Sequence, residues 1–203
     1  MSFKTKQSIN IFDTLTNQIQ ELKTLEKNIL KMYVCGPTIY DRPHLGNARS
    51  IVIYDLLYRF FLQIFDKVIF VRNITDVDDK INQSAKEQNI SIQELTQKIL
   101  QFFYEDINAL NVLKPTFEPK VTENITEIIQ IIQKLLDNNN AYIEGGHVLF
   151  DVSSYKNYGK LSNRKIDELI SGARIEIADY KRNPLDFVLW KPASPNDDIS
   201  SVF

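Results

Sequence analysis

The sequence predicts an α/β fold with a parallel sheet, followed by a smaller α+β domain. A short apolar strand is expected at residues 32–35, a long apolar helix at residues 48–65 and a second apolar strand at residues 67–74. Two adjacent parallel strands need such a crossover helix, and strands covered on both faces read as near-continuous apolar runs. After residue 115 the pattern changes to a new helical stripe and a glycine-bearing hairpin, which indicates a second domain.

The composition is that of a folded protein of 203 residues. Hydrophobic residues make up 43%, charged residues 25%, and the net charge is −2, which excludes a disordered chain and gives no general attraction to nucleic acid. Residues 156–191 hold eight Lys or Arg against five Asp or Glu, a mild basic bias that we interpret as a solvated face. The sequence has neither a signal peptide nor 18 consecutive apolar residues, so we expect a cytoplasmic protein.

The first predicted strand ends on the only cysteine of the chain, Cys35. Gly36 and Pro37 stop the strand, because proline lacks the donor that a ladder needs and glycine accepts turn dihedrals. A single cysteine cannot form an intramolecular disulfide. Cys35 is therefore a buried apolar residue, a reactive thiol or a metal ligand in a reducing compartment.

A turn containing His44, Gly46 and Asn47 precedes the long helix. The free N–H groups and the dipole at a helix start stabilise phosphate oxygens. Gly46 permits a close approach of a ligand, while His44 and Asn47 can donate hydrogen bonds to it. Alone, these residues are more typical of a surface turn with a capping asparagine. Their place between a strand and a helix, at the carboxyl edge of a parallel sheet, favours a phosphate site.

The segment after the second strand reads TDVDD at residues 75–79. Its three carboxylates could hold a metal, but we interpret them as a helix start that complements the helix dipole. Ser91, with Glu94 three residues later, is typical of the N-cap of an amphipathic helix. Pro115 and Pro119 then break the chain, and we place a domain boundary there.

We expect a first domain at residues 1–114 that includes an N-terminal lead-in, a second at residues 115–192, and a polar tail at residues 193–203. The second domain should contain a helix from residue 125, a hairpin over residues 141–150, a short helix at residues 166–171, and a strand and turn within residues 174–191. In it, we interpret His147 as a strand residue and not a metal ligand, and Trp190 as core. Residues 182–184 are either an RNA contact or a turn held by tertiary hydrogen bonds.

Four separated blocks carry a family resemblance that covers nearly the whole chain. They read MYVCGPTIYDRPHLGN at residues 32–47, VRNITDVDDKI at 71–81, DINALNVLKP at 106–115 and KRNPLDFVLWK at 181–191. The first block resembles the first signature of class I aminoacyl-tRNA synthetases, and the four together resemble the cysteinyl-tRNA synthetase family. The resemblance implies the first half of the class I Rossmann-like nucleotide-binding fold, with the second domain as an inserted α+β connective domain.

The resemblance also implies roles for individual residues. Cys35 corresponds to a zinc ligand, and His44 and Asn47 to catalytic residues. The family motif often has a second histidine where this chain has Asn47, but an amide can still donate to phosphate. The implied ATP-binding residues are Pro37, Thr38, His44, Gly46 and Asn47, and the implied cysteine-binding residues are Cys35, Gly36 and Thr75.

The implied activity is ATP-dependent activation of L-cysteine to cysteinyl-adenylate, followed by transfer to tRNA(Cys). ATP would come with magnesium, and one zinc ion would select the thiol, with its remaining ligands absent from this chain. The intact enzyme is expected to be a monomer, and this chain alone to have little activity and a tendency to associate. Two alternatives stay open: a mycothiol-pathway cysteine ligase with an amino-sugar acceptor, and a non-catalytic truncated relic of the fold.

Overall fold

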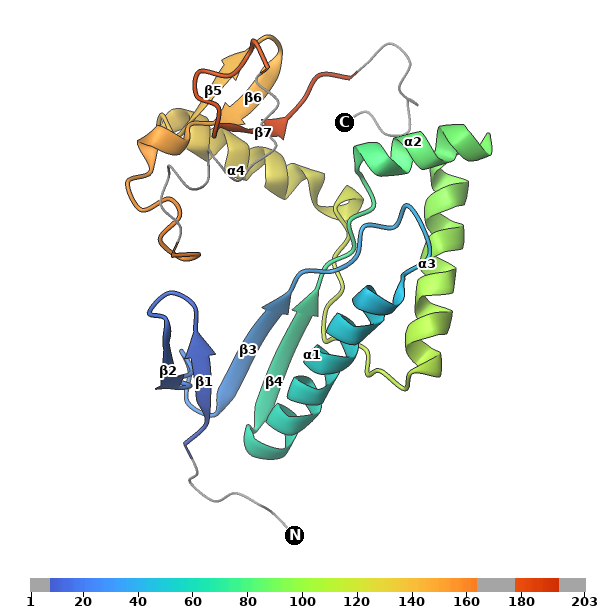
Figure 1. Ribbon diagram of the computed structural model, residues 1–203, viewed down its shortest axis with the longest axis vertical. Coiled ribbons are helices and arrows are strands. Elements are labelled where there is room, and N and C mark those ends of the chain that lie inside the picture. Colours follow the sequence, from blue (N-terminus) through green and yellow to red (C-terminus); the bar gives the residue numbers. More distant parts are fainter. Residues whose placement is uncertain (1–7, 164–177, 194–203) are drawn as a thin grey trace. The chain divides into compact units, whose positions relative to one another are not determined.

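The computed structural model describes residues 8–163 and 178–193 (Figure 1). They form two compact units, one of residues 23–125 and one that joins residues 8–22 to the described residues from 126 onward. The helix predicted at residues 166–171 lies outside the described residues, as do residues 174–177 and the predicted tail beyond residue 193. None of the described helices is long and apolar enough to cross a membrane.

The first unit is built on two parallel strands, β3 (Ile29–Val34) and β4 (Lys67–Arg72), connected by helix α1 (Leu45–Ile64). The strands pair in register over their whole length, from Ile29 opposite Lys67 to Val34 opposite Arg72. This confirms the predicted strand, helix and strand, although β3 begins three residues earlier than expected. Cys35 lies immediately beyond its last residue.

A segment at residues 116–121 runs parallel to β4 on its other side. The N–H of Arg72 donates to the carbonyl of Phe117 at 3.1 Å, and that of Ile74 donates to Pro119 at 2.9 Å. β4 therefore has hydrogen-bonded neighbours on both sides, which suits its buried side chains and its near-continuous apolar sequence.

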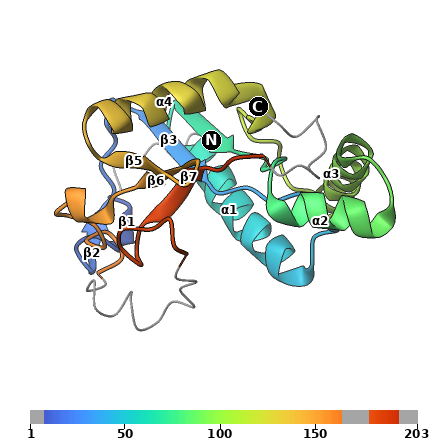
Figure 2. The ribbon, with the colours of Figure 1, turned by 90° about the horizontal axis from the view of Figure 1, so that it is seen from above.

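Helix α1 lies along one face of the β3–β4 pair in both views (Figures 1 and 2). Its opposite side carries an apolar stripe that stays exposed, with Leu56 67% and Phe60 48% accessible, next to Val52 and Ile53. An exposed apolar stripe of this kind favours association. The predicted tendency of the chain to associate stays a prediction.

The core of the first unit is centred on α2 (Asp79–Gln88) and α3 (Ile92–Ala109). Ser91 caps α3 by accepting from the N–H of Glu94 at 3.1 Å, as predicted. The buried side chains recur at every fourth position of α3, which gives the helix one continuous apolar face. These side chains are Leu95, Ile99, Phe103 and Ile107.

The carboxylates of Asp76 and Asp78, in the acidic segment before α2, accept hydrogen bonds that stabilise the local structure. Asp78 caps the helix by accepting from the N–H of Lys80 at 2.8 Å. Asp76, which is buried, accepts from the N–H of Thr122 at 3.0 Å and from its hydroxyl at 2.6 Å. The interpretation of these carboxylates as a helix start is confirmed for Asp78, the cap, and for Asp79, which lies in the first turn of α2. Asp76 instead fastens the short 3-10 helix Thr122–Asn124.

The second unit contains a three-stranded antiparallel sheet beside helix α4 (Figures 1 and 2). The predicted hairpin is present, with Gly145 and Gly146 in its turn at φ 54° and 77°. The N-terminal lead-in forms a separate two-stranded hairpin in this unit. The elements are β1 (Asn10–Asp13), β2 (Gln18–Glu21), α4 (Ile125–Asp137), β5 (Ala141–Glu144), β6 (His147–Phe150), a 3-10 helix (Val152–Ser154) and β7 (Phe187–Trp190).

A buried carboxylate holds the turn before β7. Asp186 is 1% exposed and accepts from the Tyr142 hydroxyl at 2.7 Å, and from the N–H groups of Val152 and Asn183 at 3.0 Å each. Residues 182–184 thus form a turn held by tertiary hydrogen bonds, the second of the two alternatives given above for them.

Two further predictions for this unit have different outcomes. His147 is the first residue of β6 and stacks on Tyr180 with ring centroids 3.9 Å apart, as expected of a strand residue. The prediction of Trp190 as core is wrong. Its side chain is only half-buried, at the end of β7, one of the two edge strands of this sheet.

Candidate active site

The site begins where β3 and β4 stop pairing and their chains continue as turns. The N–H of Gly36 donates to the side-chain oxygen of Asn73 at 2.8 Å. Further along, the N–H of Thr75 donates to the carbonyl of Pro37 at 2.9 Å, and that of Ile39 donates to the carbonyl of Thr75 at 3.2 Å. The two turns are therefore joined by backbone and side-chain hydrogen bonds at the carboxyl ends of the strands.

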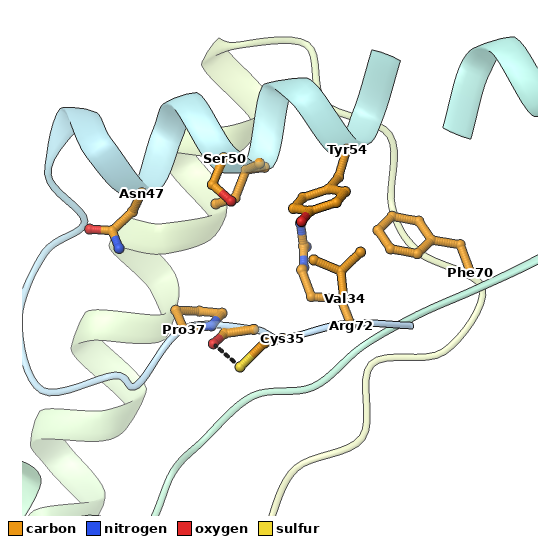
Figure 3. Close-up of a pocket in the computed structure, with 10 residues that line it drawn as sticks. Val34, Cys35, Pro37, Asn47, Ser50, Tyr54, Phe70 and Arg72 are labelled. Atoms are coloured by element: carbon orange, nitrogen blue, oxygen red, sulfur yellow. Dashed lines mark hydrogen bonds between the residues drawn. The ribbon is translucent and has the colours of Figure 1, made fainter. Parts of the chain in front are cut away.

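A hollow of about 70 Å³ lies between the first of these turns and α1 (Figure 3). The side chains of Asn47, Ser50 and Tyr54 point from α1 toward the segment that contains Cys35 and Pro37. The structure thus brings together four residues predicted from the sequence, Cys35, Gly36, Pro37 and Asn47. The complete lining is Val34, Cys35, Gly36, Pro37, Asn47, Ser50, Ile51, Tyr54, Phe70 and Arg72.

The Cys35 side chain is exposed, which rules out the alternative of a buried apolar residue. Its sulfur makes one weak contact, 3.8 Å from the carbonyl oxygen of Gly36. Among the described residues, no group of three or more His, Cys, Asp or Glu side chains is placed to hold a metal ion. A catalytic zinc site needs at least three protein ligands, so the described residues by themselves do not fit one.

His44 and Asn47 form a reciprocal cap at the start of α1. The N–H of Gly46 donates to His44 Nδ1 at 3.0 Å, and the N–H of His44 donates to the side-chain oxygen of Asn47 at 3.1 Å. Because Nδ1 accepts from a backbone N–H, the neutral imidazole carries its proton on Nε2. The Nε2–H of His44 and the side-chain NH₂ of Asn47 are the donors left for an incoming anion.

Thr38 and Thr75 are neighbours through an isolated parallel bridge, and neither lines the hollow. Thr75 is linked to the hollow through Asn73, whose NH₂ donates to the Thr75 hydroxyl at 3.1 Å. The predicted site residues therefore fall into three connected groups: the strand-end segment 35–37, the helix cap 44–47 and the Thr38–Thr75 pair.

An ion pair fastens the turn that precedes α1. Arg42 donates two hydrogen bonds to Asp106 on α3, at 3.0 and 2.7 Å. The hydrogen bond from Arg42 and the charge of that guanidinium hold the pKa of Asp106 below its usual value. This bidentate pair fixes the position of the turn that leads to His44.

Sequence reasoning missed Ser50, Tyr54, Arg72 and Asn73. Ser50 and Tyr54 lie three and seven residues after Asn47, so helical spacing could have placed them on the same face of α1. Arg72 could have been noticed as a cation that ends an apolar strand. The role of Asn73 depends on the pairing of β3 with β4 and has no local signal.

Residues 21–201 match the family described as the catalytic domain of class I (C) tRNA synthetases. The chain belongs to this family. Its α/β fold with a parallel strand pair is that of the class, as predicted. In the LeuRS of Agrobacterium radiobacter K84, solved in a ternary complex with tRNA and LeuAMS, a similar fold is found with a TM-score of 0.50 at 15% identity; the match covers 64% of this chain and 18% of that one.

Relatives of this class I synthetase chain include cysteine–tRNA ligases from three bacteria. It is 50% identical over 192 residues to that of Beijerinckia indica, 48% over 192 residues to that of Methylocella silvestris and 48% over 189 residues to that of Wolbachia pipientis. These matches cover 93 to 94% of this chain and 41 to 43% of the relatives. The chain thus spans about two fifths of the length of the curated relatives that it matches.

Proposed function

We propose that this chain forms part of a cysteine–tRNA ligase, which activates L-cysteine with ATP and transfers it to tRNA(Cys). The observation that carries the proposal is the meeting of a strand-end cysteine, a glycine–proline turn and a helix-start asparagine around one hollow. The identity of 46 to 50% to cysteine–tRNA ligases supports it. Such an enzyme would work in the cytoplasm as a monomer. Of the residues 115–192 predicted to form a connective domain, those from 126 onward would do so, because residues 115–125 belong to the first unit.

In the first reaction, a carboxylate oxygen of L-cysteine attacks the α-phosphorus of ATP. A C–O–P mixed anhydride forms, the bond from the α-phosphorus to the bridging oxygen breaks, and pyrophosphate leaves with its magnesium. His44 Nε2–H and the NH₂ of Asn47 would donate to the phosphate oxygens on which charge develops. Gly46 lets the backbone approach the nucleotide, and Pro37 and Thr38 would line its path.

In the second reaction, a hydroxyl at the 3′ end of the tRNA attacks the carbonyl carbon of cysteinyl-adenylate. An ester bond forms, AMP leaves with the electron pair of the anhydride bond, and the hydroxyl proton passes to solvent. Cys35, Gly36 and Thr75 would contact the amino acid. As a zinc ligand, Cys35 would need partners from outside the described residues, and we derive no step through that ion.

Transfer of radiolabelled cysteine tests the proposal. In a chimeric ligase, this chain replaces the matching segment of the Beijerinckia indica enzyme, to which it is 50% identical. We expect the chimeric ligase to charge tRNA(Cys). A folded chimera that transfers cysteine to an amino sugar in place of tRNA would indicate the mycothiol-pathway alternative. A folded chimera that activates no cysteine would indicate the non-catalytic relic.

A further inference from the structure

The side chain of Asn73 lies between two segments of the candidate site, and its orientation follows from its partners. Its oxygen accepts from the N–H of Gly36 at 2.8 Å, and its NH₂ lies 3.1 Å from the Thr75 hydroxyl oxygen. A backbone N–H can only donate, so the amide oxygen must face Gly36. The NH₂ group must then face Thr75.

This orientation decides how the Thr75 hydroxyl can be used. An NH₂ group can only donate, so the Thr75 oxygen accepts from Asn73 and its own hydrogen is left for another partner. Accepting one hydrogen bond polarises a hydroxyl and makes it a better donor. Among the described residues, Thr75 has no second side-chain hydrogen bond in which this hydrogen is used.

The position of Asn73 is itself fixed by close backbone packing. A Cβ built on Gly36 would lie 1.4 Å from the carbonyl oxygen of Asn73, so the two backbones touch where only glycine fits. Asn73 is half-buried there, and its side chain replaces the ladder hydrogen bond that is lost where β3 and β4 stop pairing. The amide therefore has little freedom to turn.

We propose that Asn73 is a positioning residue that sets the Thr75 hydroxyl as a hydrogen-bond donor to an acceptor atom of the amino-acid substrate. In L-cysteine the acceptors are the carboxylate oxygens and the thiol sulfur. The inference rests on the proposed function, because that function places Thr75 against the amino acid. Through Gly36, the same amide also fixes the backbone next to Cys35.

The Asn73→Asp variant tests directly which group donates in the hydrogen bond between Asn73 and Thr75. The new carboxylate still accepts from Gly36, but it can no longer donate, so it takes up the hydroxyl hydrogen of Thr75. In the chimeric ligase we expect Asn73→Asp and Thr75→Val each to raise the KM for cysteine about tenfold in ATP–pyrophosphate exchange, which is typical of one lost hydrogen bond. The kcat should change little, and the double variant should resemble either single one. Asn108→Asp, the same change at an exposed position of α3, should leave the KM unchanged.

A KM raised about a hundredfold in the double variant, the product of the two single effects, would overturn the inference, because two independent contacts would then be lost.

Hydrogen exchange on the 203-residue chain gives a readout that does not depend on activity. Protection of the Gly36 N–H should persist in Asn73→Asp and vanish in Asn73→Ala, and Thr75→Val should speed exchange of the Asn73 NH₂. The opposite pattern would overturn the inference even if the chimeric ligase were inactive, whereas inactivity of the unsubstituted chimera would count against the proposed function alone.

Discussion

At the scale of the residue, Arg72 shows how a charge is kept next to the hollow. Its side chain is 3% exposed and donates to one oxygen of Glu118 at 3.0 and 2.6 Å. The Tyr104 hydroxyl donates to the other oxygen of Glu118 at 2.7 Å. Burial, together with the hydrogen bond and charge of Glu118, raises the pKa of Tyr104, which therefore stays protonated as a donor.

We predict that Glu118→Ala destabilises the first unit by about 3–5 kcal/mol, because it leaves the Arg72 charge buried and unpaired. Tyr104→Phe should cost about 1.5–3 kcal/mol, the range for a hydrogen bond to a charged group. Native-state hydrogen exchange of the β4 amides measures both changes. As a control, Glu123→Ala removes the exposed pair with Lys120 and should cost less than about 1 kcal/mol. An equally small loss for Glu118→Ala would contradict this account of Arg72.

At the scale of the element, the start of α1 combines a structural cap with the proposed phosphate contact. We predict that His44→Ala costs about 0.5–2 kcal/mol of stability, the usual loss for a helix cap. His44→Asn should keep the cap, because asparagine is a favoured residue at that position, but it has no Nε2–H. In the chimeric ligase, His44→Asn should therefore lower the rate of ATP–pyrophosphate exchange about 100-fold, as for other lost transition-state donors. Wild-type exchange by His44→Asn would show that the histidine only caps the helix.

The ion pair that fastens the turn before α1 should make its stability depend on pH. The pKa of Asp106 is lowered in the folded chain, so its contribution is present above the ordinary aspartate pKa and is lost as the pH falls through the lowered value. We predict that the melting temperature of Asp106→Asn lies below that of the wild type at pH 7, and that the difference disappears in acid. A difference that does not depend on pH would contradict the ion-pair explanation.

Sequence patterns predicted the elements best where the signal is local. The spacing of Leu95, Ile99, Phe103 and Ile107 predicted α3, and Ser91 predicted its start. The N-terminal hairpin was missed, although Asp13, which accepts from the N–H of Leu15 and the hydroxyl of Thr16, forms a recognisable turn. Contacts between distant residues could not be predicted in this way. The Asp186 network and the Asn73 link exist only because strands far apart in the sequence become neighbours.

At the scale of the whole molecule, this member of the class I synthetase family gathers its candidate site residues in one unit. The hollow at Cys35, the cap at His44 and the Thr75 hydroxyl lie in one unit, and a zinc-binding cluster is missing among the described residues. Four of the residues named from the family resemblance, Cys35, Gly36, Pro37 and Asn47, lie around the hollow, and their roles stay a prediction. The sequence could not predict that the Thr75 hydroxyl is linked through Asn73 to Gly36, since that depends on how the two turns pack.

Cysteine-dependent ATP–pyrophosphate exchange tests the central claim most directly, because it requires both the amino-acid and the phosphate contacts. We predict that the chimeric ligase catalyses exchange with L-cysteine and much less with L-serine, while the 203-residue chain alone exchanges far more slowly. Exchange by the chain alone at the rate of the chimera, or a folded chimera that shows no exchange with cysteine, would contradict the account.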